Sequence, residues 1–332
     1  MERSASVVTI SDIAQELGVS KSTVSRVINC KGRIGAETRR RVMEKVQSCN
    51  YVPNPMAKGL VLRQTFNIGV VIPKNEENNP FFQNCLVGIS ESVYKAGYDA
   101  LIVVQGGGDI TPLRRLVINR KVDGIILTRL EEKDESVDFL KKEGIPFIVM
   151  GTPDDNEFCH VGSDQISGCY EMTKFMISRG CEKVAVLAGD NKNSVNTFRF
   201  EGFKRGFASS GISLDGSVVH WNLENQKDVF SILPDIMKKN PQCLVCMDDI
   251  ICVYVLKWLK QNDYEVPADI QVISFYDSQV LENNTPPITA LNVNVSNLTK
   301  KAGSLLVDII EGKKVPSHTK VGYELRIRES FR

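Results

Sequence analysis

Eight runs rich in valine, isoleucine and leucine recur through residues 66–275, and this series is the strongest constraint on the fold. Segments long enough for helices separate the runs, which lie at 66–72, 99–104, 122–128, 145–151, 183–189, 217–221, 243–247 and 270–275. Apolar strands that alternate with helices are typical of parallel sheets covered on both faces. Eight such units with these lengths do not fit well into one open sheet. The pattern therefore predicts an α/β body of two doubly wound lobes.

The division between the lobes is expected near residues 162–164, where the strand rhythm is lost. Segments at 288–293 and 323–329 are expected to cross back between the lobes. The predicted body covers residues 66–332, with lobe 1 at about 66–162 plus 292–322 and lobe 2 at about 163–291 plus 323–332. Doubly wound sheets bind ligands beyond the carboxyl ends of their strands, so the cleft between the lobes is the expected pocket.

Residues 1–50 have a different residue pattern, which predicts three short helices. The first begins with a T-x-x-D capping signal, Thr9 to Asp12, and ends at Gly18. Ser20 can cap a second helix that runs to about residue 29, and a third covers about 36–49. This pattern predicts an all-α domain, called the head below.

Residues 51–65 contain two prolines and a glycine and predict a linker. Within it, Asn54 can cap a short hinge helix that Pro55 begins at its first position.

Charge separates the head from the body. Residues 1–65 hold eleven basic and five acidic residues, a net charge of +6, whereas the rest of the chain carries −5. The second helical pattern has a polar face, made of Lys21, Ser22, Ser25, Arg26 and Asn29. Its opposite face is mostly apolar. A helix of this kind can pack on its neighbours and lie in a DNA major groove, so the pattern predicts a helix-turn-helix.

Several function classes are disfavoured. No segment has the length and apolarity of a signal peptide or a membrane span, so a cytoplasmic protein with reduced cysteines is expected. Cys243 and Cys246 have C-x-x-C spacing, but they stand in an apolar run and predict buried strand thiols rather than a metal or redox site. We expect no metal and no cofactor.

An enzyme is not expected either. The glycines at 106–108 match neither phosphate-binding motif, and the three histidines occur in no nucleophile-elbow context. An exported solute-binding protein would share the two-lobed body, but the missing signal peptide and the basic head argue against it.

The order of motifs closely resembles the lactose-repressor/galactose-repressor (LacI/GalR) family. The resemblance covers nearly the whole chain and is carried by residues 9–29, 38–42, 50–60, 68–73, 122–127, 198–203, 247–256, 266–275 and 286–291. It implies a sequence-specific transcription regulator, most often a repressor, that binds double-stranded operator DNA as a homodimer. A small effector between the lobes would control its operator affinity.

The resemblance also implies roles for residues of the head and linker. Lys21, Ser22 and Arg26 match the base-contacting positions, and Arg26 could pair with a guanine edge. Leu60 matches the leucine that wedges into the minor groove from a hinge helix, and Gly59 is a departure that weakens such a helix. The predicted DNA-binding residues are Ser20, Lys21, Ser22, Ser25, Arg26, Asn29, Asn54, Ala57 and Leu60.

In the body, the resemblance and the residue chemistry together predict an effector site. Its predicted residues are Phe81, Phe82, Arg199, Trp221, Asp248, Asp249 and Tyr276. A guanidinium and paired carboxylates suit adjacent hydroxyls, and aromatic faces suit a sugar ring. Core packing is the alternative for Phe82 and Trp221, a surface salt bridge for Arg199, and helix capping for the two aspartates.

Tyr276 stands where the family typically has an aspartate that hydrogen-bonds the effector, with Asp277 one position later. This departure suggests an altered ligand. The mixture of aromatic rings, a guanidinium and carboxylates predicts a sugar or sugar derivative as the effector. A purine or nucleoside, or a protein co-effector, is the alternative.

Overall fold

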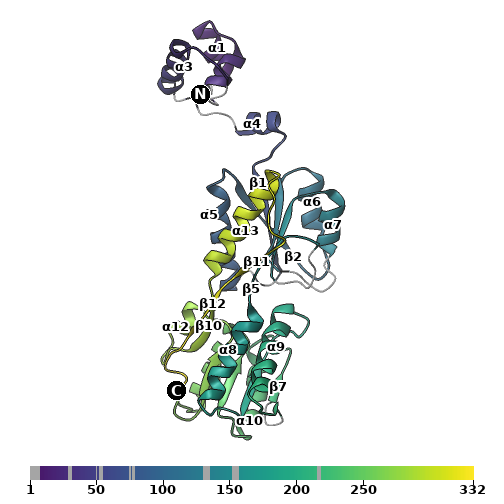
Figure 1. Cartoon of the computed structure of the whole chain (residues 1–332), viewed down its shortest axis with the longest axis vertical. Helices are drawn as coiled ribbons and strands as arrows, with labels where there is room; N and C mark the ends of the chain where they lie inside the picture. The colour runs from purple at the N-terminus through teal and green to yellow at the C-terminus, as the bar shows by residue number, and fades with distance from the viewer. Residues whose placement is uncertain are drawn as a thin grey trace, which may run out of the picture. The chain divides into compact units, whose positions relative to one another are not determined.

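The computed structural model describes residues 8–28, 32–49, 51, 55–74, 76, 79–129, 135–151, 157–214 and 218–332. The chain forms two compact units, Met1–Gln64 and Thr65–Arg332 (Figure 1). The predicted combination of a helical head with a two-lobed α/β body is confirmed.

The head contains α1 (Ile10–Leu17), α2 (Lys21–Ile28) and α3 (Ala36–Ser48), which match the three predicted helices. The capping box is present. The Asp12 amide donates to Thr9 Oγ1 (3.3 Å), and the Thr9 amide donates to Asp12 Oδ2 (2.8 Å). The helices pack on a small core made of Ile13, Ala14, Val24, Val27 and Val42. This core fixes which face of α2 is left to solvent.

The linker contains the predicted short helix as α4 (Pro55–Leu62). Asn54, its expected cap, lies outside the described residues. The chain turns back directly after the helix, and the Gln64 amide donates to the Gly59 carbonyl (3.0 Å). A Cβ on Gly59 would lie 2.4 Å from the Gln64 carbonyl oxygen. Glycine, which we expected only to weaken the helix, is therefore the residue that allows this close approach.

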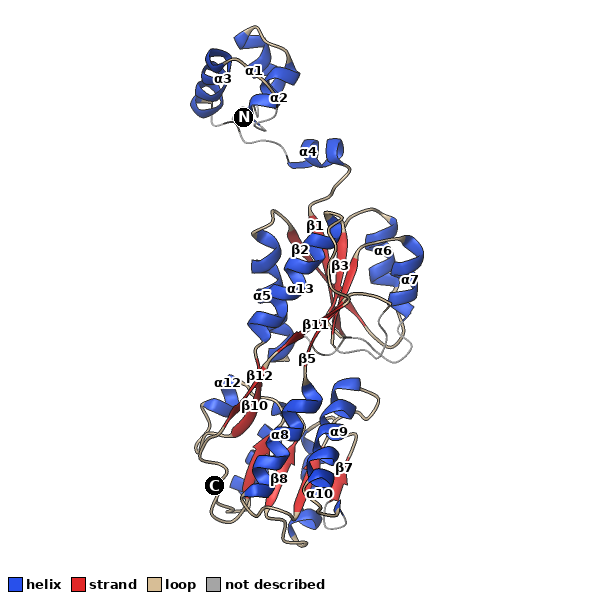
Figure 2. Ribbon diagram, viewed as in Figure 1, coloured by secondary structure: helices blue, strands red, loops and turns tan. Residues whose placement is uncertain are grey.

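The first sheet of the body is entirely parallel and has the strand order β11-β5-β4-β3-β1-β2. Its strands are β1 (Asn67–Pro73), β2 (Asp99–Gln105), β3 (Gly124–Leu127), β4 (Phe147–Met150), β5 (His160–Ser163) and β11 (His318–Val321). Helices α5 (Pro80–Tyr94) and α13 (Val295–Ile310) cover one face (Figure 2). Helices α6 (Thr111–Ile118) and α7 (Glu135–Glu143) cover the other.

The second sheet has the order β12-β10-β9-β8-β6-β7, and only β12 runs antiparallel to its neighbour. Its strands are β6 (Val184–Leu187), β7 (Val218–His220), β8 (Cys243–Cys246), β9 (Gln271–Ser274), β10 (Thr289–Val293) and β12 (Tyr323–Arg326). Helices α8 (Gln165–Ser178) and α9 (Ser194–Ser209) pack on one face, and α10 (Gln226–Met237) and α11 (Asp249–Gln261) on the other. The short α12 (Gln279–Glu282) follows β9.

The segments near the expected junctions between the lobes are strands. The strand rhythm was expected to be lost near 162–164, but β5 lies there and leads directly into α8. The segments at 288–293 and 323–329 supply β10 and β12, which pair with each other inside the second sheet. Strands β5 and β11 went unrecognised because His160–Ser163 and His318–Val321 are not apolar runs. Backbone pairing to their neighbours, rather than a side-chain pattern, makes them strands.

Candidate functional site

The first candidate surface is the exposed face of α2. Lys21, Ser22 and Arg26 are exposed and Ser25 is half-buried, whereas Val24 and Val27 are buried in the head core. Asn29 lies outside the described residues. The α2 helix thus presents three donor-bearing side chains on a rigid support, which is the arrangement that direct reading of base edges requires.

Ser20 caps this helix, and its contact with DNA stays a prediction. Its Oγ accepts a hydrogen bond from the Thr23 amide (3.1 Å) and shares one with Ser22 Oγ (2.8 Å). The predicted capping role is therefore present, and Ser20 links the cap to one of the exposed side chains.

The linker helix exposes a strongly apolar surface. Leu60 is 83% exposed and Val61 is 81% exposed. Ala57 lies in α4, but its side chain is outside the described part of the chain, as is Asn54. Two adjacent apolar side chains in solvent are costly unless a partner covers them.

In the body, Arg199 lies on α9 and is almost fully buried. Its Nε donates to Gln165 Oε1 (3.1 Å), and Nη1 donates to the Met247 carbonyl (2.6 Å). These bonds position the guanidinium beside the carboxyl end of β8. The alternative, a surface salt bridge, does not describe this residue.

Asp248 and Asp249 follow β8. Asp248 caps α11 through a hydrogen bond from the Ile251 amide (2.8 Å), so the capping alternative applies to it. Burial raises the pKa of both carboxyls above their ordinary value, and the Arg199 charge opposes that rise in each. Asp249 is buried, and no ion pair with it occurs in the described part of the chain. The three groups therefore form one electrostatically coupled set.

Aromatic residues from both lobes meet at this set. Phe81, near the start of α5 in lobe 1, makes an edge contact with Tyr276 of lobe 2, with ring centroids 6.0 Å apart. The Arg199 guanidinium lies 5.5 Å from the centre of the Tyr276 ring. Phe82 is buried next to Phe81, in agreement with the core-packing alternative, and the Arg129 guanidinium lies 5.0 Å from its ring centre.

Trp221 is separate from this group in its contacts. It lies just after β7 and packs edge-on against Phe200, with ring centroids 5.2 Å apart. Its indole also contacts the core between α8, α9 and the second sheet. The structure thus favours core packing for Trp221, and its effector role stays a prediction.

The structure adds charged residues that the sequence reasoning missed. Glu76 and Arg129 form an ion pair (2.8 Å), and the Glu76 charge reaches Asp248 across the lobes and contributes to its raised pKa. Both residues come just after strands of the first sheet. Their position beyond the carboxyl ends of β1 and β3 was the signal that could have revealed them.

Asp277 is not part of the coupled set of Arg199, Asp248 and Asp249. Its carboxylate accepts two hydrogen bonds from the Arg328 guanidinium (2.7 and 2.9 Å) and one from Asn292 Nδ2 (3.3 Å). The acid one position after Tyr276 therefore stabilises the second sheet and does not replace the aspartate that the resemblance led us to expect.

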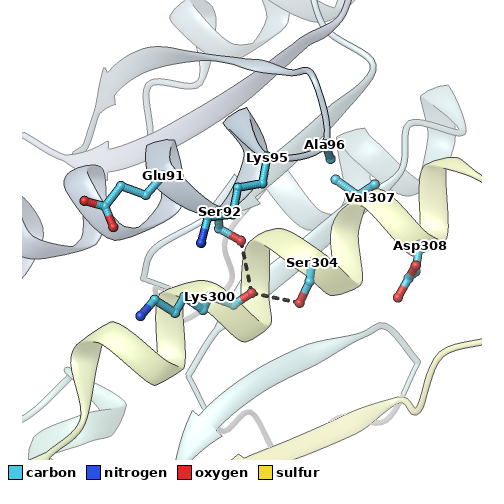
Figure 3. Close-up of a pocket in the computed structure, with 8 residues that line it drawn as sticks. All are labelled: Glu91, Ser92, Lys95, Ala96, Lys300, Ser304, Val307 and Asp308. Carbon is cyan, nitrogen blue, oxygen red and sulfur yellow. Dashed lines mark hydrogen bonds between the residues drawn. The ribbon is translucent and has the colours of Figure 1, made fainter.

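A separate pocket lies between α5 and α13 on lobe 1 (Figure 3). Ser92 on α5 donates a hydrogen bond to the Lys300 carbonyl on α13 (3.1 Å) and so links the two helices, whereas Ser304 donates to the same carbonyl (2.8 Å) within α13. Carboxylates and ammonium groups are mixed along its lining, so it presents no single charge to a ligand.

Cys243 and Cys246 are buried in β8, as predicted, and burial raises the pKa of both thiols. Among the described residues, no three potential ligands come together as a metal site would need. Within the same residues, no helix has the length and apolarity to cross a membrane.

Two protein families match the chain. Residues 9–54 match the family described as bacterial regulatory proteins, lacI family, and residues 173–331 match the periplasmic binding protein-like domain. Together they cover the head and most of lobe 2.

Curated relatives are similar along their whole length. The HTH-type transcriptional repressor PurR of Photobacterium profundum is 29% identical over 98% of each chain. The HTH-type transcriptional regulator CelR of Thermobifida fusca is 25% identical over 97% of this chain and 98% of that protein.

Solved structures share the fold. The Lac repressor dimer bound to operator and the anti-inducer ONPF has a TM-score of 0.83 at 20% identity, over 97% of this chain and 98% of that one. The transcriptional regulator CelR–cellobiose complex has a TM-score of 0.73 at 24% identity, over 97% and 99%.

Proposed function

Because the chain belongs to the lacI family of bacterial regulatory proteins, we propose that it is a cytoplasmic transcription regulator and that it acts as a repressor. Its head binds a specific operator, and a small effector in the cleft between the lobes controls its affinity for that operator. The relatives carry the names of regulators, and this chain likewise binds its effector without chemical turnover.

The exposed polar face of α2 is the observation that carries this proposal. The side chains of Lys21, Ser22 and Arg26 are exposed on the side of α2 away from the head core, and the head and linker carry a net positive charge. Base-edge contacts from Arg26 would supply specificity, whereas other basic residues of the head would contact phosphates and set the register.

A homodimer fits the exposed apolar surfaces. Besides Leu60 and Val61 on α4, lobe 1 exposes Val87 on α5 and Ile102 and Val104 on the edge strand β2. A second copy would cover them and would place two heads on two half-sites of a pseudo-palindrome. Sedimentation of a stable monomer at micromolar concentration, with full operator affinity, would contradict the dimer.

For the effector, we propose a sugar or sugar derivative bound at Phe81, Arg199, Asp248, Asp249 and Tyr276. Carboxylates and a guanidinium match adjacent hydroxyls, and the aromatic rings match the C–H face of a sugar. A relative solved with cellobiose has the same fold. A purine or nucleoside is the second candidate, since flat aromatic surfaces also accept a base.

The DNA-binding proposal is tested with Arg26→Ala on an operator selected from a randomised DNA pool. We expect the variant to lose about 5- to 150-fold in operator affinity and little on random DNA. The matched control is Arg40→Ala, because Arg40 is an exposed basic residue on α3 that is tied to Glu37 (2.7 Å) and Glu44 (2.9 Å). Equal losses on both DNAs would make Arg26 a phosphate contact.

The effector proposal is tested by a thermal-shift screen of sugars, sugar phosphates and nucleobases, since a ligand of the native state raises its stability. The compound found is then titrated into operator complexes of Arg199→Ala and Asp249→Ala. Each variant should keep effector-free DNA binding and lose the effector response, because a ligand shifts an equilibrium only through differential contacts. A wild-type response in both variants would place the pocket elsewhere.

A further inference from the structure

The backbone of Tyr276 is held on both sides. Ser274, which is buried, donates through Oγ to the Tyr276 carbonyl (2.6 Å) and accepts from the Tyr276 amide (3.3 Å). The Phe275 amide donates to the Cys246 carbonyl (2.8 Å), and the Asp277 amide to the Leu291 carbonyl (2.9 Å). The backbone is therefore fixed to β8 and β10, and the side chain leaves it in a determined direction.

That side chain lies between the two lobes. The residue is only 7% exposed, and its ring meets the Phe81 ring of lobe 1 at an interplanar angle of 80°. On the side of lobe 2, the Arg199 guanidinium lies 5.5 Å from the ring centre. The pKa of the Tyr276 phenol is raised mainly by burial, and the nearby Asp249 charge raises this pKa further.

We infer that the Tyr276 ring holds the two lobes together. Edge-on aromatic contacts and guanidinium–ring contacts are both attractive, so the ring interacts favourably with Phe81 of lobe 1 and with Arg199 of lobe 2.

This inference does not depend on the proposed function, because it concerns only the contacts between the lobes. The test needs neither effector nor DNA. Amide hydrogen exchange is measured by mass spectrometry on the full-length chain, for the wild type, Tyr276→Ala and Tyr276→Phe. The matched control is Tyr264→Ala, because Tyr264 stacks on Trp258 (5.8 Å, 21°) and packs against the core of lobe 2.

In Tyr276→Ala, exchange should become about 2- to 12-fold faster at the start of α5 in lobe 1 and in α9 in lobe 2, the factor expected when one aromatic pair is lost. Tyr276→Phe keeps the ring and should exchange like the wild type. Tyr264→Ala should leave α5 unchanged.

Faster exchange confined to lobe 2 in Tyr276→Ala would overturn the inference, as would a Tyr276→Phe variant that behaves like Tyr276→Ala. If Tyr276→Ala does not fold, Phe81→Leu removes the contact from the lobe 1 side and should accelerate exchange near Tyr276; unchanged exchange there refutes the bridge. DNA binding can succeed or fail independently of these results, so the two proposals are tested separately.

Discussion

Removing the carboxylate of Asp277 should destabilise lobe 2 strongly. The Asp277 and Arg328 side chains are only 4% and 14% exposed, and two hydrogen bonds of 2.7 and 2.9 Å join them. In Asp277→Ala the Arg328 guanidinium stays buried without its counter-ion. Breaking a buried pair from one side typically costs about 3–5 kcal/mol, and we expect a loss of this size in the free energy of unfolding.

The assay is urea denaturation followed by tryptophan fluorescence. The two tryptophans of the chain, Trp221 and Trp258, both belong to lobe 2, so the signal reports the lobe that carries the ion pair. The control is Asp235→Ala, which removes the ion pair with Lys238 (2.7 Å). Those side chains are 78% and 76% exposed, and the loss should stay below about 1 kcal/mol.

A second comparison separates the buried charge from the lost contact. Asp277→Leu combined with Arg328→Met replaces both charges by apolar groups and should recover most of the loss. The reasoning is refuted if Asp277→Ala costs no more than Asp235→Ala, or if the double variant is as unstable as the single one.

Three further changes have defined outcomes. Burial raises the pKa of Asp249 in the folded state, so the native state holds this proton more tightly than the unfolded chain, and stability is lost as pH rises through the folded pKa. Asp249→Asn should therefore have a higher urea midpoint than the wild type at pH 7, and this difference in midpoint should vanish below about pH 4. An equal difference in midpoint at both pH values would exclude ionisation as the cause. Thr9→Ala removes the capping box with Asp12 and should cost about 1 kcal/mol, seen as roughly 5-fold faster amide exchange in α1, and unchanged exchange would contradict this. Gly59→Ala should not gain the roughly 1 kcal/mol of stability that alanine adds to a helix, because the new Cβ would meet the Gln64 carbonyl. Amide exchange at Gln64 should become faster, and slower exchange would show that the turn adapts.

The parts of the fold that could be predicted from the sequence depend on neighbouring residues. Thr9 and Asp12 form a capping box three positions apart, and Ser20 caps α2 in the same way. The apolar runs became strands because burial on both sheet faces selects such runs wherever they fall in the chain. Local signals of this kind depend only on residues that are close in sequence, so they are the same in any tertiary arrangement.

Much of the candidate site was also predictable, for a topological reason. Phe81, Asp248, Asp249 and Tyr276 all come after the carboxyl ends of strands, and parallel strands bring those ends to one edge of each lobe. Trp221 follows a strand too, but it is at the sheet edge, where its ring packs on Phe200. Position after a strand is thus a useful signal, and the direction of the side chain decides whether it applies.

Only the tertiary structure decided which residues distant in sequence pair with each other. Arg328 binds Asp277 from 51 positions away, and Phe81 meets Tyr276 from the other lobe. Strands β5 and β11 likewise exist through backbone pairing to neighbours that are remote in sequence. The sequence determined which residues are buried and where helices begin, because these depend on residue type and local spacing. Which partners meet depends on strand order and on the chain crossings between the lobes, and no local pattern encodes these.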